Sequence, residues 1–439
     1  MGFSNQDSCD LEEQSPGSNS LGRLSCTTFN ILAPIYKRLH DQICESEFRE
    51  LWLRRNESIL DGLLNLGSSI ICLQEFWVNN QELASMYEKR LGDAGYATYK
   101  LARTNNRGDG LLIAVSCNHF RVMNYQEFLF NDIGDRVAQI LHVELLHHAS
   151  QNQATEKKEV LIVNTHLIFP HDSSYCFVRL KQVYKILHYI DSYCHDYKLP
   201  SVPVILCGDW NGSKKGNVYK FLQSQGFISS YDIFHPYNND GEDFSKWISH
   251  RNHRGNVCGV DFIWFRNPRK HLRPLKESFM EAVLGNINQN LLHNLSTKGI
   301  GPLDFLETDG CCITYSQLSR ALGTLNLSGQ CQDALSTEDM KKLWEHMDTN
   351  GDGVIDLSDL TGVWNPCGPV HLEEDNEENG VGTEELLSTH STETTIGFTV
   401  NKAMFLPQEV ENGMWPENYS LSDHAQLTVE FSVVQLGDS

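Results

Sequence analysis

The chain has 439 residues, of which 40% are hydrophobic and 21% charged, a composition typical of a globular protein with room for two or three domains. The formal net charge of −22 argues against indiscriminate binding of nucleic acid through a basic surface, although a local basic groove or a metal site that handles phosphate stays possible. The 13 cysteines follow no disulfide framework, and neither a signal peptide nor a transmembrane run is visible, so we expect a cytoplasmic or nuclear protein.

Short β-rich runs alternate with helical patterns along the first part of the chain. Residues 1–21 are polar and acidic and are expected to form a disordered tail. Strand-like runs bounded by polar or glycine residues cover 24–32, 68–76, 109–116, 136–145, 159–167, 201–210 and 259–265. Apolar residues recur at spacings of three and four over 54–67 and 179–194, which predicts amphipathic helices, the first ending at Gly67.

The pattern changes after Phe265. Helical patterns dominate 280–330, an Asp- and Gly-rich loop occupies 348–359, and the stretch from 371 to 395 is acidic and poor in apolar residues. Strand-like alternation returns at 425–436. We therefore expect one α/β domain split into 22–280 and 396–439, with a helical module inserted at 281–366 and an acidic linker at 367–395.

Polar side chains end most of the predicted strands. They are Asn30, Glu75, Asn164, His166, Asp209, Asn211, Asp261, Asp423 and His424. Each alone is more often a turn, cap or hydrogen-bonded structural residue. Together they supply carboxylates, amides and imidazoles without paired cysteines, the ligand preference of Mg²⁺ or Mn²⁺ rather than zinc. Asn164 and His166 should share one face of their strand, as would Asp209 and Asn211 if that strand continues.

The ordered motifs FNIL, CLQE, NTHL, CGDWN, VDFIW and SDH resemble the endonuclease/exonuclease/phosphatase superfamily over about residues 22–280 and 395–435. They are most similar to its deadenylase-like branch of nocturnin and Angel-type proteins. An appended calcium module resembles a group of calcium-binding members from plants. The resemblance implies a four-layer α/β sandwich, two packed mixed β-sheets flanked by helices (DNase I-like), with an inserted all-α EF-hand pair.

The resemblance also implies a role for each residue that binds metal or positions water. Glu75 would bind the catalytic Mg²⁺ or Mn²⁺ directly, with Asn30 beside it and Asp423 contributing to the metal shell. Asp209 would position or activate the attacking water, and Asn211 would orient the scissile phosphate. These roles suit phosphodiester cleavage, because a cation neutralises the phosphate and lowers the pKa of bound water.

Two histidines complete the implied catalytic set. His424 would sit beside the phosphate, held in one tautomer by Asp261, and His166 would donate to a phosphate oxygen as charge builds. The residues leave open whether Asp209 or His424 is the general base.

Other candidates for substrate contact are Asn164, Arg103 (with Arg107 nearby) and Trp247. Arg103 lies in the loop just before a predicted strand, and Trp247 lies in the locally basic stretch SKWISHRNHRG, where its ring could stack on a base. For both residues an ordinary surface loop is an equally good explanation.

The loop DTNGDGVIDLSD fits the EF-hand template. Its expected Ca²⁺ ligands are Asp348, Asn350, Asp352, Val354 (through its carbonyl), Asp356 and Asp359. Gly353 falls at the sharp turn, and Ser336 with Asp339 resembles a capping box before the preceding helix. Asp359 stands where Glu is usual, which should lower the affinity for Ca²⁺ and let Mg²⁺ compete.

A second, degenerate hand is expected upstream. Alignment of Ile313 with Ile355 at position 8 of the loop places Leu306, Thr308 and Gly310 at ligand positions, so this hand should bind no metal and each chain should bind one Ca²⁺.

The sequence therefore predicts a Mg²⁺-dependent phosphoesterase that cleaves RNA or a nucleotide, with a calcium-binding EF-hand that could regulate it. One alternative is a calcium-responsive binding or scaffold protein with an inactive hydrolase fold. Another is a phosphoesterase of the phosphoinositide or sphingomyelin type. The oligomeric state is not indicated by the sequence.

Overall fold

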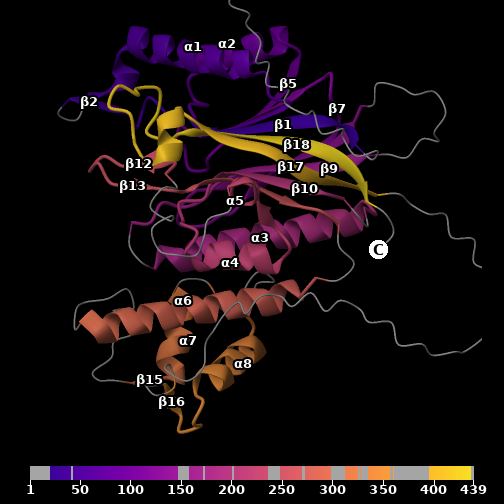
Figure 1. Cartoon of the computed structure of the whole chain (residues 1–439). Coiled ribbons are helices and arrows are strands. Elements are labelled where there is room, and N and C mark those ends of the chain that lie inside the picture. Colours follow the sequence, from indigo (N-terminus) through magenta and orange to yellow (C-terminus); the bar gives the residue numbers. More distant parts are fainter. Residues whose placement is uncertain are drawn as a thin grey trace, which may run out of the picture.

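Two six-stranded sheets packed face to face form the centre of the molecule, with helices on both outer sides (Figure 1). The computed structural model describes residues 20–40, 43–146, 158–171, 174–199, 202–235, 248–268, 272–297, 312–324, 327, 335–355, 359 and 395–436. Both sheets are mixed, and the predicted fold class, an α/β sandwich of two packed mixed sheets between helices, is confirmed. No helix in these ranges is long and apolar enough to cross a membrane.

The first sheet joins the beginning and the end of the chain. Its strands, in order, are β17 (Thr395–Leu406), β18 (Gln426–Leu436), β1 (Ser20–Asn30), β4 (Ile70–Phe76), β6 (Gly110–Ser116) and β5 (Tyr96–Ala102). β1 pairs in parallel with β4 and antiparallel with β18, so the segments on either side of the predicted insertion belong to one sheet. β1 starts at Ser20, inside the expected tail, and residues 1–19 lie outside the described ranges.

The second sheet carries the other strands of the predicted domain. Its order is β11 (Ile228–Ser229), β14 (Asp261–Arg266), β10 (Val204–Asp209), β9 (Glu159–His166), β8 (Val137–Leu145) and β7 (Phe120–Leu129). β9 and β10 are parallel, and β14 runs antiparallel to β10. Most of the strand residues that face inward between the sheets are apolar and buried, which explains the continuous apolar runs in the sequence.

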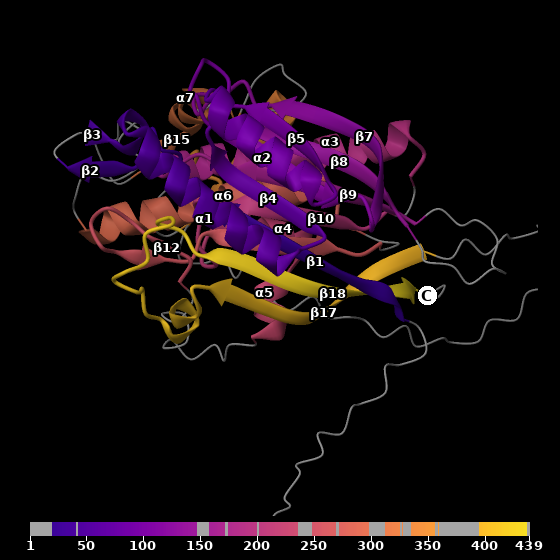
Figure 2. The same ribbon diagram turned by 90° about the horizontal axis from the view of Figure 1, so that it is seen from above.

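Helices cover the outer face of each sheet. α1 (Arg49–Leu66) and α2 (Gln81–Asp93) lie over the first sheet, as Figure 2 shows from above, and α3 (Tyr175–Asp196) and α4 (Asn217–Ser224) lie below the second. Gly67 ends α1 in the left-handed conformation with φ 63°, as predicted. The apolar face of α3 is buried, in agreement with its spacing of three and four.

α6 (Leu275–Thr297) packs on this helical layer and leads to the last group of helices. Phe279 of α6 stacks on Tyr184 of α3 with ring centroids 4.3 Å apart. Beyond α6 lie α7 (Tyr315–Thr324), α8 (Thr337–Met347), β15 (Ile313–Thr314) and β16 (Val354–Ile355) (Figure 1). The domain boundary expected after residue 280 therefore runs through α6, because the first turns of this helix pack on the sandwich.

Short elements surround one end of the sandwich. They are β2 (Arg38–His40), β3 (Ile43–Cys44), η1 (Glu45–Glu47), α5 (Ser230–Phe234), β12 (His250–Arg251), β13 (Val257–Cys258) and η3 (Gln408–Asn412). β2, β12 and β13 mark the end at which β1 and β4 finish (Figure 1). The loops at this end carry the side chains described in the next section.

A buried arginine on α1 holds these loops together, which gives a stability prediction. The Arg55 guanidinium pairs with buried Glu45 and donates to the carbonyl oxygens of Ile31 (2.7 Å), Leu32 (2.8 Å) and Leu421 (2.8 Å). Arg55→Met removes the guanidinium and leaves Glu45 with only Lys37, whose Nζ lies 3.5 Å from Oε1, so the free energy of unfolding should fall by about 3 kcal/mol in urea denaturation.

The neighbouring residue offers a matched control. Arg54 is exposed, and Arg54→Met should change the free energy of unfolding by no more than about 0.5 kcal/mol. Equal effects of the two substitutions would show that the buried network contributes no more than a surface charge.

Candidate active site

The first sheet brings Asn30 and Glu75 together. Asn30 is the last residue of β1 and is fully buried, and its Nδ2 donates to Glu75 Oε1 (3.3 Å) and to Asp209 Oδ2 (3.0 Å). The register of β4 against β6 shifts between Gln74 and Phe76, and Glu75 between them has φ 53°. This bulge turns the Glu75 side chain, whose Oε2 accepts the backbone N–H of Ala33 at 3.1 Å.

The second sheet places His166 and Asp209 side by side at the ends of β9 and β10. The two residues are register partners, and His166 Nε2 lies 3.2 Å from Asp209 Oδ2. β10 ends at Asp209, so the condition for a face shared with Asn211 is not met. Instead, Asn211 adopts φ 47°, its N–H donates to Asp209 Oδ1 (2.9 Å), and its Nδ2 lies 3.0 Å from His166 Nε2.

His424 is held against Asp261 by a short hydrogen bond. Asp261 is the register partner of Asp209 in β14, and His424 Nδ1 lies 2.9 Å from Asp261 Oδ2. Ser249 Oγ donates to the same carboxylate oxygen at 2.7 Å. His424 Nε2 is thereby directed to Asp209 Oδ2, 3.6 Å away, because the Nδ1–H is committed to Asp261.

Asp423 lies beside a histidine that the sequence analysis did not select. His250 Nε2 is 3.6 Å from Asp423 Oδ2, and the His250 ring stacks on that of His424 with centroids 4.2 Å apart. The only signal in the sequence was its place in the basic stretch just before the strand of Asp261. Two sets of side chains here have ligand atoms close enough to share a metal ion, His250–Asp423–His424 and Asp209–Asp261–His424.

Arg136 is a second residue that the sequence analysis missed. It directly precedes β8 and is 7% exposed, and its Nε and Nη1 have no hydrogen-bond partner in the part of the chain that the structure describes. Burial and the nearby Arg103 lower its pKa to about 10, against the opposing effect of Asp109, Glu75 and Asp209. It is therefore a charged, unsatisfied donor near the carboxylates.

Burial and neighbouring charges shift the pKa values of Glu75 and His424. Burial, together with the charges of Asp423 and Asp109, raises the pKa of Glu75 to about 7. Burial opposes the charged form of His424, but the carboxylates of Asp261 and Asp209 outweigh it and raise the pKa of that imidazole to about 10. Glu75 is half-buried and has no cationic side chain within salt-bridge distance among the described residues, so a divalent cation could satisfy its charge.

The three further candidates for substrate contact lie in different surroundings. Asn164 is fully buried between the sheets, where its amide bonds the carbonyl oxygens of Leu73 and Leu112 and accepts from Gln74. Arg103 pairs with Asp109 at 3.2 Å. Trp247 lies outside the described ranges. We therefore leave Asn164 out of the site proposed below, because its side chain joins the two sheets.

In the loop that begins at Asp348, side-chain oxygens accept hydrogen bonds from backbone N–H groups of the same loop. Asp348 Oδ2 accepts from Gly353 N (3.0 Å), Asn350 Oδ1 from Asp352 N (2.9 Å), and Asp352 Oδ1 from Val354 N (3.0 Å). Asp359 Oδ1 accepts from the backbone N–H of Thr349 (3.0 Å). Asp356, Leu306, Thr308 and Gly310 lie outside the described ranges.

The pairing of β15 with β16 connects this loop to the upstream segment. Ile313 is the register partner of Ile355, which is the pair that the alignment of the two hands requires. The predicted capping box is also present, with Ser336 Oγ accepting from Asp339 N and the Asp339 carboxylate accepting from Ser336 N.

The chain is similar to several known proteins in sequence and to solved structures in fold. A protein described as an uncharacterized calcium-binding protein of Arabidopsis thaliana is 51% identical over 427 residues, which cover 94% of this chain and 85% of the relative. The Arabidopsis carbon catabolite repressor protein 4 homolog 3 is 26% identical over 220 residues, 48% of this chain and 45% of that protein. The solved human nocturnin catalytic domain with bound sulfate is 21% identical, covers 55% of this chain and 81% of that one, and has a TM-score of 0.42.

The sequence pattern of the Endonuclease/Exonuclease/phosphatase family matches residues 27–277, more than half of the chain. This match spans the strands that carry Asn30, Glu75, His166, Asp209 and Asp261. The chain belongs to the endonuclease/exonuclease/phosphatase family and is a hydrolase of phosphate esters.

Proposed function

We propose that the protein is a Mg²⁺-dependent phosphodiesterase that cleaves RNA or a nucleotide substrate. The observation that carries the proposal is the meeting of Asn30, Glu75, Asp209, Asp261 and His424, which come from both sheets, at one end of the sandwich. The preference for RNA or a nucleotide rests on the deadenylase-like motifs, such as ICLQE, VNTHL and CGDWN.

The donor set suits a hard divalent cation. Glu75, Asn30 and Asp423 would hold it, because all three offer oxygen atoms and the half-buried Glu75 carboxylate has no cationic side chain within salt-bridge distance in the described ranges. When bound, the cation would neutralise charge on the phosphate and lower the pKa of a bound water.

Asp209 is the general base in this proposal. Its Oδ1 is fixed by the N–H of Asn211, while Oδ2 faces Asn30, His166 and His424. A carboxylate held in this way can accept a proton from the attacking water without reorienting.

His424 acts as a donor rather than as a base. Its raised pKa keeps the imidazolium charged near neutral pH, and Asp261 fixes the ring through Nδ1. Nε2–H can then stabilise the negative charge that develops on the phosphate. Arg136, whose Nε and Nη1 have no hydrogen-bond partner among the described residues, would add a second positive charge to the same site.

We further propose that the loop from Asp348 to Asp359 binds one Ca²⁺ and that the segment at Ile313 is its partner hand. Support comes from the register pair Ile313–Ile355 and from the inward carboxylates of Asp348 and Asp352. α8, which ends at the loop, is tied to α6 by a salt bridge between Lys276 and Asp339 at 2.6 Å. Ca²⁺ could thus influence the hydrolase through α6.

Asp209→Asn should reduce turnover by about 10³-fold, because the amide keeps the shape of the side chain but cannot accept the proton of the water. The measurement is a Mg²⁺-containing panel of RNA, single-stranded DNA, a nucleotide and a generic phosphodiester. Asp61→Asn is the matched control, since Asp61 is exposed on α1 and should leave turnover unchanged. Full activity of Asp209→Asn would overturn the assignment.

Asp261→Asn should lower the pKa of His424 by about 1–3 units in the metal-free protein, because it removes the carboxylate nearest to Nδ1. NMR titration of the imidazole measures this change. The raised pKa of His424 stabilises the folded state fully below about pH 6.5 and progressively less as the pH rises to about 10. The variant should therefore be least stable relative to the wild type below about pH 6.5, and the difference should shrink as the pH approaches 10.

Ser249→Ala is the control for this titration. It removes a hydrogen bond to the same Asp261 oxygen but no charge, so the pKa of His424 should stay close to its wild-type value. An unchanged pKa in Asp261→Asn would show that the two side chains are not coupled.

Asp359→Glu should raise the affinity for Ca²⁺ about tenfold, because the longer side chain reaches a bidentate position more easily. Calorimetric titration of the whole chain measures the affinity, and Asp348→Ala should abolish binding. Weaker binding by Asp359→Glu than by the wild type would contradict the assignment of Asp359 to position 12 of the loop.

A further inference from the structure

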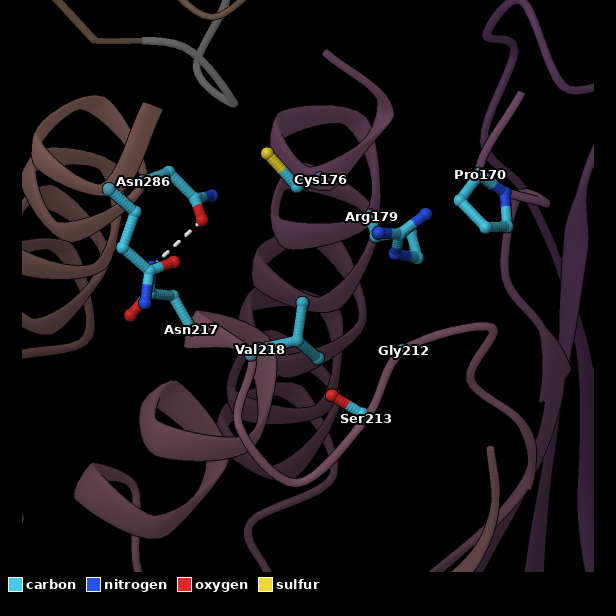
Figure 3. Close-up of a pocket in the computed structure, with 10 residues that line it drawn as sticks. Pro170, Cys176, Arg179, Gly212, Ser213, Asn217, Val218 and Asn286 are labelled. Atoms are coloured by element: carbon cyan, nitrogen blue, oxygen red, sulfur yellow. Dashed lines mark hydrogen bonds between the residues drawn. The ribbon is translucent and has the colours of Figure 1, made fainter. Parts of the chain in front are cut away.

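A cavity lies behind the loop that follows β10, on the side away from His166. Its volume is about 500 Å³, and α3, α4, α6 and the loop from Gly212 to Gly216 form its walls (Figure 3). Asn211 turns its side chain to His166 in the active site, whereas the next two residues, Gly212 and Ser213, line this cavity. The loop therefore separates the two sites.

Arg179 is the only charged residue among the described residues that line the cavity. It is 9% exposed, and the single hydrogen bond that its guanidinium makes within the described ranges is a long one, from Nη1 to the carbonyl oxygen of Ile168 at 3.4 Å. No carboxylate of those ranges lies within salt-bridge distance of it. In a chain of net charge −22, a buried and unpaired arginine is a position for an anion.

Asn286 of α6 faces the cavity with an unpartnered donor. Its side chain is 4% exposed, and its Oδ1 accepts from Asn217 Nδ2 at 2.9 Å. Its own Nδ2 has no hydrogen-bond partner among the residues described, and Figure 3 shows this nitrogen on the side of the amide away from Asn217. A buried amide donor of this kind normally has an acceptor, which here would be a bound ligand.

The N-terminus of α4 contributes backbone donors. The cap residue Gly216 provides no side-chain acceptor, and the first backbone hydrogen bond of the helix is donated by Tyr219. The N–H groups of Asn217 and Val218, which line the cavity, donate to no atom of the described chain. Free N–H groups and the helix dipole together favour an anion at this position.

We propose that this cavity is a second binding site, distinct from the active site, for a phosphate group. Arg179, Asn286 and the N-terminus of α4 supply donors from three elements, and no acidic residue is among the described residues that line it. The cavity also has room for an organic group attached to the phosphate, since ligand pockets commonly have volumes of about 300–1,000 Å³. The phosphate could thus be free or carried as a monoester.

Binding is tested by calorimetric titration of the full chain in EDTA, with inorganic phosphate in one arm and adenosine 5′-monophosphate in the other. Asn286→Asp keeps the oxygen that accepts from Asn217 but replaces the free donor by a negative charge. It should weaken binding at least tenfold. Gln223→Glu, which places the same charge on an exposed position of α4 outside the cavity lining, should weaken it no more than about twofold by screened electrostatics.

His424→Ala separates this site from the active site, and its phosphate binding should match that of the wild type. Tighter binding of the nucleotide than of inorganic phosphate would identify a monoester, and equal binding would identify the free ion. Both results support the site. It is overturned if neither ligand binds, if Asn286→Asp binds like the wild type, or if His424→Ala abolishes binding. Arg179→Gln provides an independent second variant with the same expected loss.

Discussion

The hydrogen bond between Asn30 and Asp209 connects the two sheets at the end where the site forms. It joins the last residue of β1 to the last residue of β10, and the same Asn30 amide reaches Glu75. Because each sheet supplies only part of the set, the distance between the sheets determines whether the carboxylates can act on one phosphate. The packed apolar layer between the sheets fixes that distance, so the site depends on the core.

Residues that end regular strands could be predicted from the sequence, because an apolar run followed by a polar residue marks both the strand and its end. Asn30, His166 and Asp209 are of this kind, whereas Asp261 begins β14. Asn211 was expected to share a face with Asp209 only if that strand continued. The strand ends at Asp209, and a left-handed turn at Asn211 brings its side chain to His166. No periodic pattern in the sequence predicts such a turn.

Other parts of the site could not be predicted, because the fold brings together residues that are distant in the sequence. His250 contacts His424 only because β12 packs against the loop that carries Asp423. Arg136 belongs to the site only because the fold brings it near Glu75 and Asp209, which are distant in sequence. β17 was missed because its register shifts at Val400 and Lys402, which interrupts the alternation of apolar and polar residues. The expected boundary after residue 280 falls inside α6, because a helix whose first turns pack on the sandwich shows no break in its pattern at that point.

The pairing of β18 with β1 has a consequence for the way the molecule is made. β1 is synthesised before β18, and α6 and the loop from Asp348 to Asp359 lie between them in the sequence. His424, just before β18, arrives after every other member of the site. A growing chain can therefore collapse around its central strands while its phosphate site is still incomplete, and it gains the complete site only after His424 has been made.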